Sequence, residues 1–438
     1  MEGSNEAPHD IENPYIPLAK SMNRELDVLA PLSSSCCIYR VPERLRRVSE
    51  KAYTPQVVSI GPLHHGKEGL QAMEEHKKRY LRDFIRRTRV SLEHYIKKIK
   101  DQEGKIRSCY AETIEFSSDD FVRIVLVDAA FIIEVLLRHR FHELQDENDR
   151  IFNKPWMLQD VWPDIRLLEN QLPFFVLEDL FDPDKIDVPS DSNCTERLSI
   201  IKLSHVFFKD LEGADGNLDK MCAYKAEHFV DFCRKLYLPL PLERQAKGKL
   251  KTLNTPSITE LHRAGVKFRV GSAKNLLDIQ FNDGILEIPK LTISDETELT
   301  VRNLLAFEQC HCMENYMNDY VVIMDRFVNT AKDVELLVKH GIVENRLGDS
   351  SGGSTLINNL ADGVIVDSND FYFATLCEDL NKYCKTSWHK WKANLRQNYC
   401  NTPWATLSIA AAVLLLVLTL IQTMCSVGSV WQSKKPHK

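Results

Sequence analysis

The chain has 438 residues, of which 44% are hydrophobic and 27% charged, and its net charge is −6. This ordinary globular composition excludes a fibrous or wholly disordered chain and argues against nucleic-acid binding over the whole surface. The 12 cysteines lack compact spacing, so we expect reduced thiols rather than a disulfide scaffold. Residues 1–20 have neither a basic start nor an apolar run, so we expect no secretory signal.

Residues 1–35 are polar with scattered prolines, and we expect a disordered leader there. A helical domain is predicted over 36–400. Its first part contains two short strand candidates, at 37–42 and 56–60, which are followed by proline or by Gly61-Pro62. His64 and His65 come directly after the second candidate.

A helical pattern runs from 68 to about 106, and the face opposite its apolar residues is basic. Between Lys77 and Arg107 there are twelve Lys and Arg against four Asp and Glu, a local charge of +8 (12 − 4). One interpretation is an anionic partner, which would be lipid headgroups, an acidic protein surface or RNA. The other is a solvated face that the acidic remainder of the chain compensates.

The next helix is predicted over 121–144, with residues 117–120 supplying its cap and first-turn acids. The sequence VRIVLVDAAFIIEVLL is apolar nearly all round, which is typical of a central core helix. A buried carboxylate at Asp128 needs a partner. We interpret it as bonded to neighbouring backbone or to an arginine, and a catalytic carboxylate is the alternative.

A further helix is predicted to begin at 160–163 and to continue through LLENQLPFFVL at 167–177. Pro173 inside this pattern predicts a kink that frees the carbonyl of Glu169. The side chains of Glu169, Asn170 and Gln171 are then expected to bond freed and neighbouring backbone groups, which is a structural role rather than a ligand site.

Residues 218–240 look helical and place His228 and Asp231 three positions apart on one face. Such a pair can act as acid and base or bind a metal, but alone it is more often a surface or capping pair. Residues 241–257 are polar and form a possible internal linker.

Past the linker the apolar period becomes two on either side of Asn282-Asp283-Gly284. This predicts a β-hairpin that pairs Phe281 with Leu286 and Ile279 with Ile288. Helices are then predicted over 295–312, 320–329 and 331–340, with capping pairs Asp295–Glu298 and Thr330–Asp333.

Two short motifs are set aside. Cys310-His311-Cys312 contains metal-ligand residue types, but adjacent helical residues point apart and no partner pair has ligand spacing, so we expect core thiols. GDSSGG at 348–353 is similar to a serine-protease motif but has one extra serine and helical surroundings.

From 368 a long amphipathic helix is predicted to lead to WATLSIAAAVLLLVLTLIQTM at 404–424, which contains no charge. As a helix this stretch would cover about 30 Å, the hydrocarbon thickness of a bilayer. We therefore expect one transmembrane helix over 403–424 and a basic tail over 425–438. Basic residues flank the stretch almost equally on both sides, and the missing secretory signal favours a body on the cytosolic side. Cys400 and Cys425 would flank the membrane as possible acylation sites, and the sequon at Asn193 would matter only outside the cell.

Several stretches together resemble the plant family catalogued as domain of unknown function 247 (DUF247), also called UPF0481-type membrane proteins. They are IYRVP at 38–42, PQVVSIGPLHHG at 55–66, LLENQLPFFVLEDLF at 167–181, residues 277–289 and the tail from Trp404. The family usually has tyrosine where this chain has Leu63. The resemblance implies a plant single-pass membrane protein without established enzymatic activity, some relatives being associated with self-incompatibility or other recognition. It assigns no catalytic residue.

These observations predict a mainly α-helical (α+β) body with a small β-hairpin and one C-terminal transmembrane helix. We expect a recognition or scaffold protein in signalling, anchored in the plasma membrane, that binds an unknown protein partner. No enzymatic activity, catalytic residue, metal or cofactor is predicted, and nucleic acid is not expected as a partner. One alternative is an enzyme that brings Asp128, His228 with Asp231, or His64 with His65 into a shared cleft. Another is binding of anionic lipid or RNA through 77–107.

Overall fold

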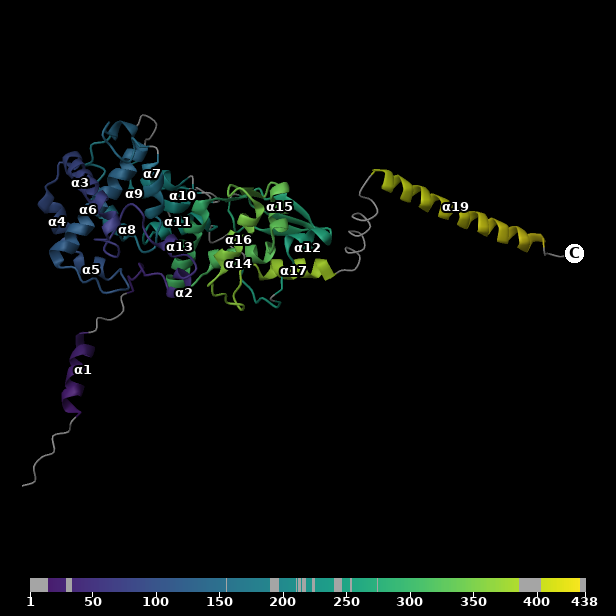
Figure 1. Cartoon of the computed structure of the whole chain (residues 1–438), viewed down its shortest axis with the longest axis horizontal. Coiled ribbons are helices and arrows are strands. Elements are labelled where there is room, and N and C mark those ends of the chain that lie inside the picture. The colour runs from purple at the N-terminus through teal and green to yellow at the C-terminus, as the bar shows by residue number, and fades with distance from the viewer. Residues whose placement is uncertain are drawn as a thin grey trace, which may run out of the picture.

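The computed structural model shows a mainly helical protein with two small sheets (Figure 1). It describes residues 15–28, 34–154, 156–189, 197–209, 211, 214, 218–222, 225–239, 246–252, 254–273, 275–385 and 403–433. Asn193, Cys400, part of the predicted linker and the end of the predicted basic tail lie outside these residues, as does the amphipathic pattern past 385. The proposed division into leader, domain, linker and tail stays a prediction.

The N-terminal half is built around α6 (Ser118–Arg140), which packs against α3, α4, α8 and α9 (Figure 1). Residues 121–138 are buried apart from Arg123, as expected for a core helix. Ser117 caps α6 by accepting from the backbone of Asp120. The surrounding elements are α2 (Glu43–Arg46), η1 (Glu50–Tyr53), η2 (Glu68–Met73), α3 (Glu74–Thr88), α4 (Leu92–Lys100), α5 (Glu103–Arg107), η3 (His142–Leu144), α7 (Met157–Asp164), α8 (Phe174–Leu180), α9 (Ile200–Phe208), α10 (Leu218–Cys222) and α11 (Phe229–Tyr237).

The single helix expected over 68–106 is broken into shorter helices. Arg89 takes a left-handed conformation with φ of 55° and ends α3, and Ser91 then caps α4 by accepting from His94 N. Tyr80, Phe84, Tyr95 and Ile99 are buried as the apolar pattern predicts, whereas Leu92 and Ile96 in the first turns of α4 are exposed. Periodicity therefore predicted most of the buried face but not the interruption.

Pro173 does not kink a helix. It is the N-cap residue of α8, and residues 165–173 form the connection from α7. The N–H groups at the start of a helix have no acceptor within the helix. The missing N–H of a proline there therefore removes no helical hydrogen bond. The prediction of one continuous helix through 177 is wrong for that reason.

The predicted hairpin forms, with β2 (Gln280–Asn282) antiparallel to β3 (Ile285–Ile288) and Phe281 opposite Leu286. Asp283 and Gly284 both have positive φ, as a tight two-residue turn requires. Ile279 lies just before β2, so its expected pairing with Ile288 falls outside the ladder. A third strand, β1 (Lys267–Val270), pairs with β3 in parallel, and a second sheet joins β4 (Leu291–Ile293) to β5 (Val343–Asn345).

Neither N-terminal strand candidate is a strand in a sheet. Ile38 makes an isolated bridge to Tyr110, and residues 56–60 form no strand. Side chains from elsewhere bind these backbone groups instead: the Asp164 carboxylate accepts from the N–H groups of Gln56, Val57 and Val58 at 2.7–3.2 Å.

The C-terminal half is joined to the first by α13 (Asp295–His311), which contacts α7 and α11 on one side and α14 and α16 on the other. Its capping box uses Ser294 and Thr297 rather than Asp295 and Glu298, whereas the predicted box of Thr330 and Asp333 is present. The GDSSGG segment starts a helix, because Asp349 accepts from Gly352 N as an N-cap. The remaining helices are α12 (Ile258–Arg263), α14 (Tyr316–Phe327), α15 (Ala331–Lys339), α16 (Ser350–Ala361) and α17 (Ala374–Lys385).

The membrane prediction is wrong. Residues Pro403–Ser433 form a helix, α19, yet within the described chain no helix is both long and apolar enough to cross a bilayer. The prediction rested on the length of 404–424 and on its lack of charge. This finding contradicts the expected transmembrane helix over 403–424. It contradicts the membrane as a partner and the single-pass localisation for the same reason.

One helix forms within the stretch expected to be a leader. It is α1 (Ile16–Val28), and its described side chains are exposed.

Candidate ligand pocket

Asp128 has a structural environment. Its carboxylate accepts from Lys77 Nζ at 2.5 Å and from Gly61 N at 2.8 Å, and neither side chain is in contact with solvent. Burial raises the pKa of Asp128 to about 6, although the Lys77 charge opposes the shift. The partner is a lysine and a backbone amide, as a buried carboxylate requires, although the sequence had suggested arginine.

His228 and Asp231 cap α11. His228 Nδ1 accepts from Asp231 N at 3.3 Å, and Nε2 lies 3.0 Å from the Cys37 carbonyl. Asp231 accepts from Glu227 N at 2.9 Å and from Lys235 at 2.5 Å. The His228 ring and the Asp231 carboxylate both bind backbone groups at or near the start of α11, which agrees with the capping interpretation.

His64 and His65 point to different surroundings. His64 is buried with Nε2 3.2 Å from Glu169, and His65 packs edge-on against Phe116. The pocket that His65 lines contains none of Asp128, His64, His228 and Asp231. This pocket therefore does not bring the residues of the enzyme alternative together.

The side chains of Cys310, His311 and Cys312 pack against other residues of the chain. Burial raises the pKa of Cys310 to about 11 and that of Cys312 to about 12, so both are poor thiolates. The His311 ring stacks on Phe307, and its Nδ1 lies 3.1 Å from Tyr39 Oη. Within the described residues, no three His, Cys, Asp or Glu side chains are placed to hold a metal ion.

The family-like stretches meet in a buried polar network. Glu169 accepts from Val41 N at 2.7 Å and pairs with Arg46, while Asn170 bonds to Ile60 N and to the Val58 carbonyl. Burial opposes ionisation of Glu169, but hydrogen bonds from His64 and Val41 and the Arg46 charge outweigh it and lower its pKa. These side chains bond neighbouring backbone as expected, and they fix the fold rather than form an open site.

Part of the basic charge of 77–107 is paired within the chain. Arg87 binds Glu134 at 2.8 Å, Arg89 binds Asp187 at 3.1 Å, and further pairs join the buried Lys77 to Asp128, Lys100 to Asp119 and Arg107 to Glu103. The local excess of charge is therefore compensated in part, as the solvated-face interpretation requires.

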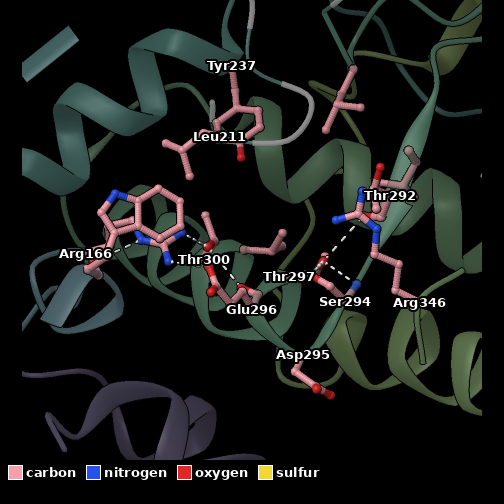
Figure 2. Close-up of a pocket in the computed structure, with 14 residues that line it drawn as sticks. Arg166, Leu211, Tyr237, Thr292, Ser294, Asp295, Glu296, Thr297, Thr300 and Arg346 are labelled. Carbon is pink, nitrogen blue, oxygen red and sulfur yellow. Dashed lines mark hydrogen bonds and ion pairs between the residues drawn. The ribbon is translucent and has the colours of Figure 1, made fainter. Parts of the chain in front are cut away.

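A pocket of about 440 Å³ lies where the two halves of the chain meet (Figure 2). One wall comes from the end of α7 and the residues after it, with Trp162 and Arg166. Leu211 and Tyr237 line a second side. The opposite wall consists of β4, the first turns of α13 and Arg346 after β5. Its size suits a small ligand or one large side chain of a partner.

Arg166 is the main polar group of this pocket. Its guanidinium stacks 3.6 Å from the Trp162 ring centroid and donates to Thr300 Oγ1 at 2.6 Å and to Glu296 at 2.9 Å (Figure 2). Burial lowers the pKa of Arg166, and Glu296 opposes the shift. Because Arg166 is stacked and bonded, it is a rigid part of the wall.

The charges of the lining balance, with two arginines, Arg166 and Arg346, against Asp295 and Glu296. The remaining wall is largely apolar, from Trp162, Leu211, Tyr237, Leu276, Leu291 and Val301, and no histidine or cysteine lines it. Such a surface favours binding of an uncharged apolar group over acid–base chemistry. No local sequence pattern predicts this pocket, because its lining residues are spread from Trp162 to Arg346.

Comparison with known proteins supports the resemblance. A family model described as a plant protein of unknown function, DUF247, matches residues 38–418. A UPF0481 protein of Arabidopsis thaliana is 30% identical over 429 residues, which covers 92% of this chain and 88% of the relative. A second UPF0481 protein of that plant is 25% identical over 506 residues, with 94% of each chain covered. No solved structure matches the chain.

Proposed function

This chain belongs to the plant DUF247 family, and we propose that it is a recognition protein without enzymatic activity that binds a partner polypeptide. The pocket at the junction of its two halves takes an uncharged apolar or aromatic side chain of that partner. The observation that carries the proposal is the balanced, mainly apolar lining around Arg166 and Trp162.

The geometry of the pocket supports this proposal in two ways. Aromatic and aliphatic anchors held in a preformed pocket contribute most of the affinity at many protein interfaces. The walls are also rigid, since Trp162 is stacked by Arg166 and the first turns of α13 are fixed by the Ser294–Thr297 capping box. A preformed wall lowers the ordering cost of binding.

The non-enzymatic part of the proposal is supported by the histidines and carboxylates considered above. Asp128 is paired with Lys77, and His228 and Asp231 are used as caps. None of them lines the pocket at the junction.

The test uses peptides selected on the purified full chain from a random library. We expect the selected peptides to share an apolar or aromatic anchor and to bind with an affinity measurable by fluorescence polarisation. Val301 is half-buried and lines the pocket, so Val301→Arg fills it and should weaken binding by at least about tenfold.

Val338→Arg is the matched control, because Val338 is 42% exposed on α15 and does not line the pocket. It should bind the peptides as the natural chain does. Selected peptides that bind Val301→Arg equally well, in a protein with unchanged thermal stability, would overturn the proposal.

A further inference from the structure

A second pocket, of about 380 Å³, is lined by residues 112–116, by Arg40 and by Pro62 with Leu63. It is separate from the pocket at the junction, with which it shares no lining residue. Its apolar walls are Pro62, Leu63, Ile114 and Phe116, and its charged groups are Arg40, the half-buried Glu112 and the exposed Glu115.

Glu112 is the unusual group in this pocket. The side chain is half-buried, and its Oε2 atom is out of contact with solvent without a hydrogen-bond partner in the described part of the chain. An unpartnered carboxylate oxygen away from water costs free energy of folding. A donor from outside the chain would remove that cost.

Arg40 supplies the opposite charge. Its Nη2 donates to the Leu63 carbonyl at 3.3 Å and its Nη1 lies 3.5 Å from Glu169, both long contacts for a guanidinium. The Glu169 carboxylate is bound more closely by Val41 N and Arg46. The Arg40 side chain is 48% exposed, so N–H donors remain for a ligand.

We propose that this pocket binds a free α-amino acid with an apolar side chain. The ligand carboxylate accepts from the fork of Arg40, its ammonium donates to Glu112, and its side chain packs against the apolar walls. An apolar α-amino acid carries a carboxylate, an ammonium and an apolar side chain. These three groups complement Arg40, Glu112 and the apolar walls of the pocket.

The Glu112 carboxylate has to turn toward the pocket for this contact. The terminal torsion of a glutamate is broad, and Oε2 has no hydrogen bond in the described chain to break. The turn therefore exchanges an unpartnered oxygen for a charge-assisted bond.

The test is thermal-shift and calorimetric titration of the full chain with L-leucine, L-valine, L-methionine and L-phenylalanine. At least one should raise the melting temperature in a dose-dependent way. Two analogues of leucine each lack one charge: 4-methylpentanoate has no ammonium, and 3-methylbutan-1-amine has no carboxylate. Each should bind at least about tenfold more weakly than leucine.

Glu112→Gln is the decisive variant, because it has no partner in the described chain to lose. We expect it to keep or raise the stability of the unliganded protein while amino-acid binding falls by at least about tenfold. Arg40→Lys keeps the charge but loses the fork, and it should also weaken binding. Glu68→Gln, at an exposed residue outside the pocket, should bind normally.

The proposal is overturned if none of the four amino acids binds at millimolar concentration. It is also overturned if either single-charge analogue binds as well as leucine, or if Glu112→Gln binds leucine normally. Peptide binding at the junction pocket is measured separately through Val301→Arg, so failure of one site does not count against the other.

Discussion

The ammonium of Lys77 lies 2.5 Å from the carboxylate of Asp128, and both side chains are out of contact with solvent. The pair joins α3 to α6 in the middle of the N-terminal half, and Lys77 also donates to the Ser59 carbonyl at 2.9 Å. A buried pair of this kind depends on both partners, because the remaining charge has no solvent to replace the lost one.

Removal of either partner should therefore be costly. We expect Lys77→Met to lower the free energy of unfolding by about 3–5 kcal/mol, since it leaves Asp128 buried without its cation. Adding Asp128→Asn to Lys77→Met should cost less than the sum of the two single changes. Urea denaturation of the four proteins measures this coupling.

The control is Arg82→Met, which removes an ion pair to Asp83 from a side chain that is 58% exposed. Its cost should be at most about 1 kcal/mol. Equal losses for Arg82→Met and Lys77→Met would contradict the structural role of the buried pair.

The Asp164 carboxylate accepts from the N–H groups of residues 56–58, of which the Val58 N–H is buried. Asp164→Ala leaves these N–H groups without this acceptor, and we expect the free energy of unfolding to fall by about 1–3 kcal/mol. Asp164→Asn keeps one acceptor oxygen and should lose less. Faster hydrogen exchange at Val57 and Val58 in Asp164→Ala would locate the damage, and Asp160→Ala, at an exposed residue of the same helix, should leave exchange unchanged.

Features set by a few adjacent residues could be predicted from the sequence. The turn at Asp283-Gly284, the capping box of Thr330 with Asp333 and the core helix around Asp128 all depend on local patterns. Contacts between distant residues could not. Gln56 and Asp164 are 108 positions apart, and the sequence around either residue does not predict a contact with the other.

The pocket at the junction was missed for the same reason, because Trp162 and Arg346 are 184 positions apart (346 − 162). The membrane prediction failed differently. It rested on the length of 404–424 and on its lack of charge, whereas no helix among the described residues is both long and apolar enough to cross a bilayer.

The hairpin turn offers a test of a close contact. At Gly284, where φ is 76°, an added Cβ would lie 2.8 Å from Tyr383 Oη. Gly66 has φ of 84° with open space around it, so Gly66→Ala should cost about 1–2 kcal/mol from conformation alone. We expect Gly284→Ala to cost more, because Tyr383 must also move away from Phe281.

Thermal and urea denaturation of both alanine variants would measure the difference. In a Tyr383→Ala background the extra cost of Gly284→Ala should disappear. If the two glycine variants lose the same stability with Tyr383 present, the contact does not constrain the turn.

His228 should make folding sensitive to acid. Burial lowers its pKa from 6.5 to about 4, with a smaller contribution from His311 and Lys235, while Asp231 and the bond to the Cys37 carbonyl oppose the shift. The unfolded chain therefore binds a proton below about pH 6.5 that the folded chain does not bind until about pH 4. Stability linked to His228 is complete above pH 6.5 and is lost as the pH falls through this window.

Other buried groups act in the opposite direction, so the total pH profile does not isolate His228. Burial raises the pKa of Asp128, Asp164 and Asp319 to about 6, which favours the folded state as the pH falls toward 4. Comparison with His228→Asn removes these shared contributions, and asparagine also retains a capping acceptor for α11.

We expect the stability advantage of the natural chain over His228→Asn to shrink by about 2 kcal/mol between pH 7 and pH 5. Urea denaturation of both proteins at the two pH values measures it. Parallel losses in the two proteins would mean that His228 binds its proton equally in the folded and unfolded chains. That result would require the ring to reach solvent when protonated, in conflict with its complete burial between the Cys37 carbonyl and Phe307.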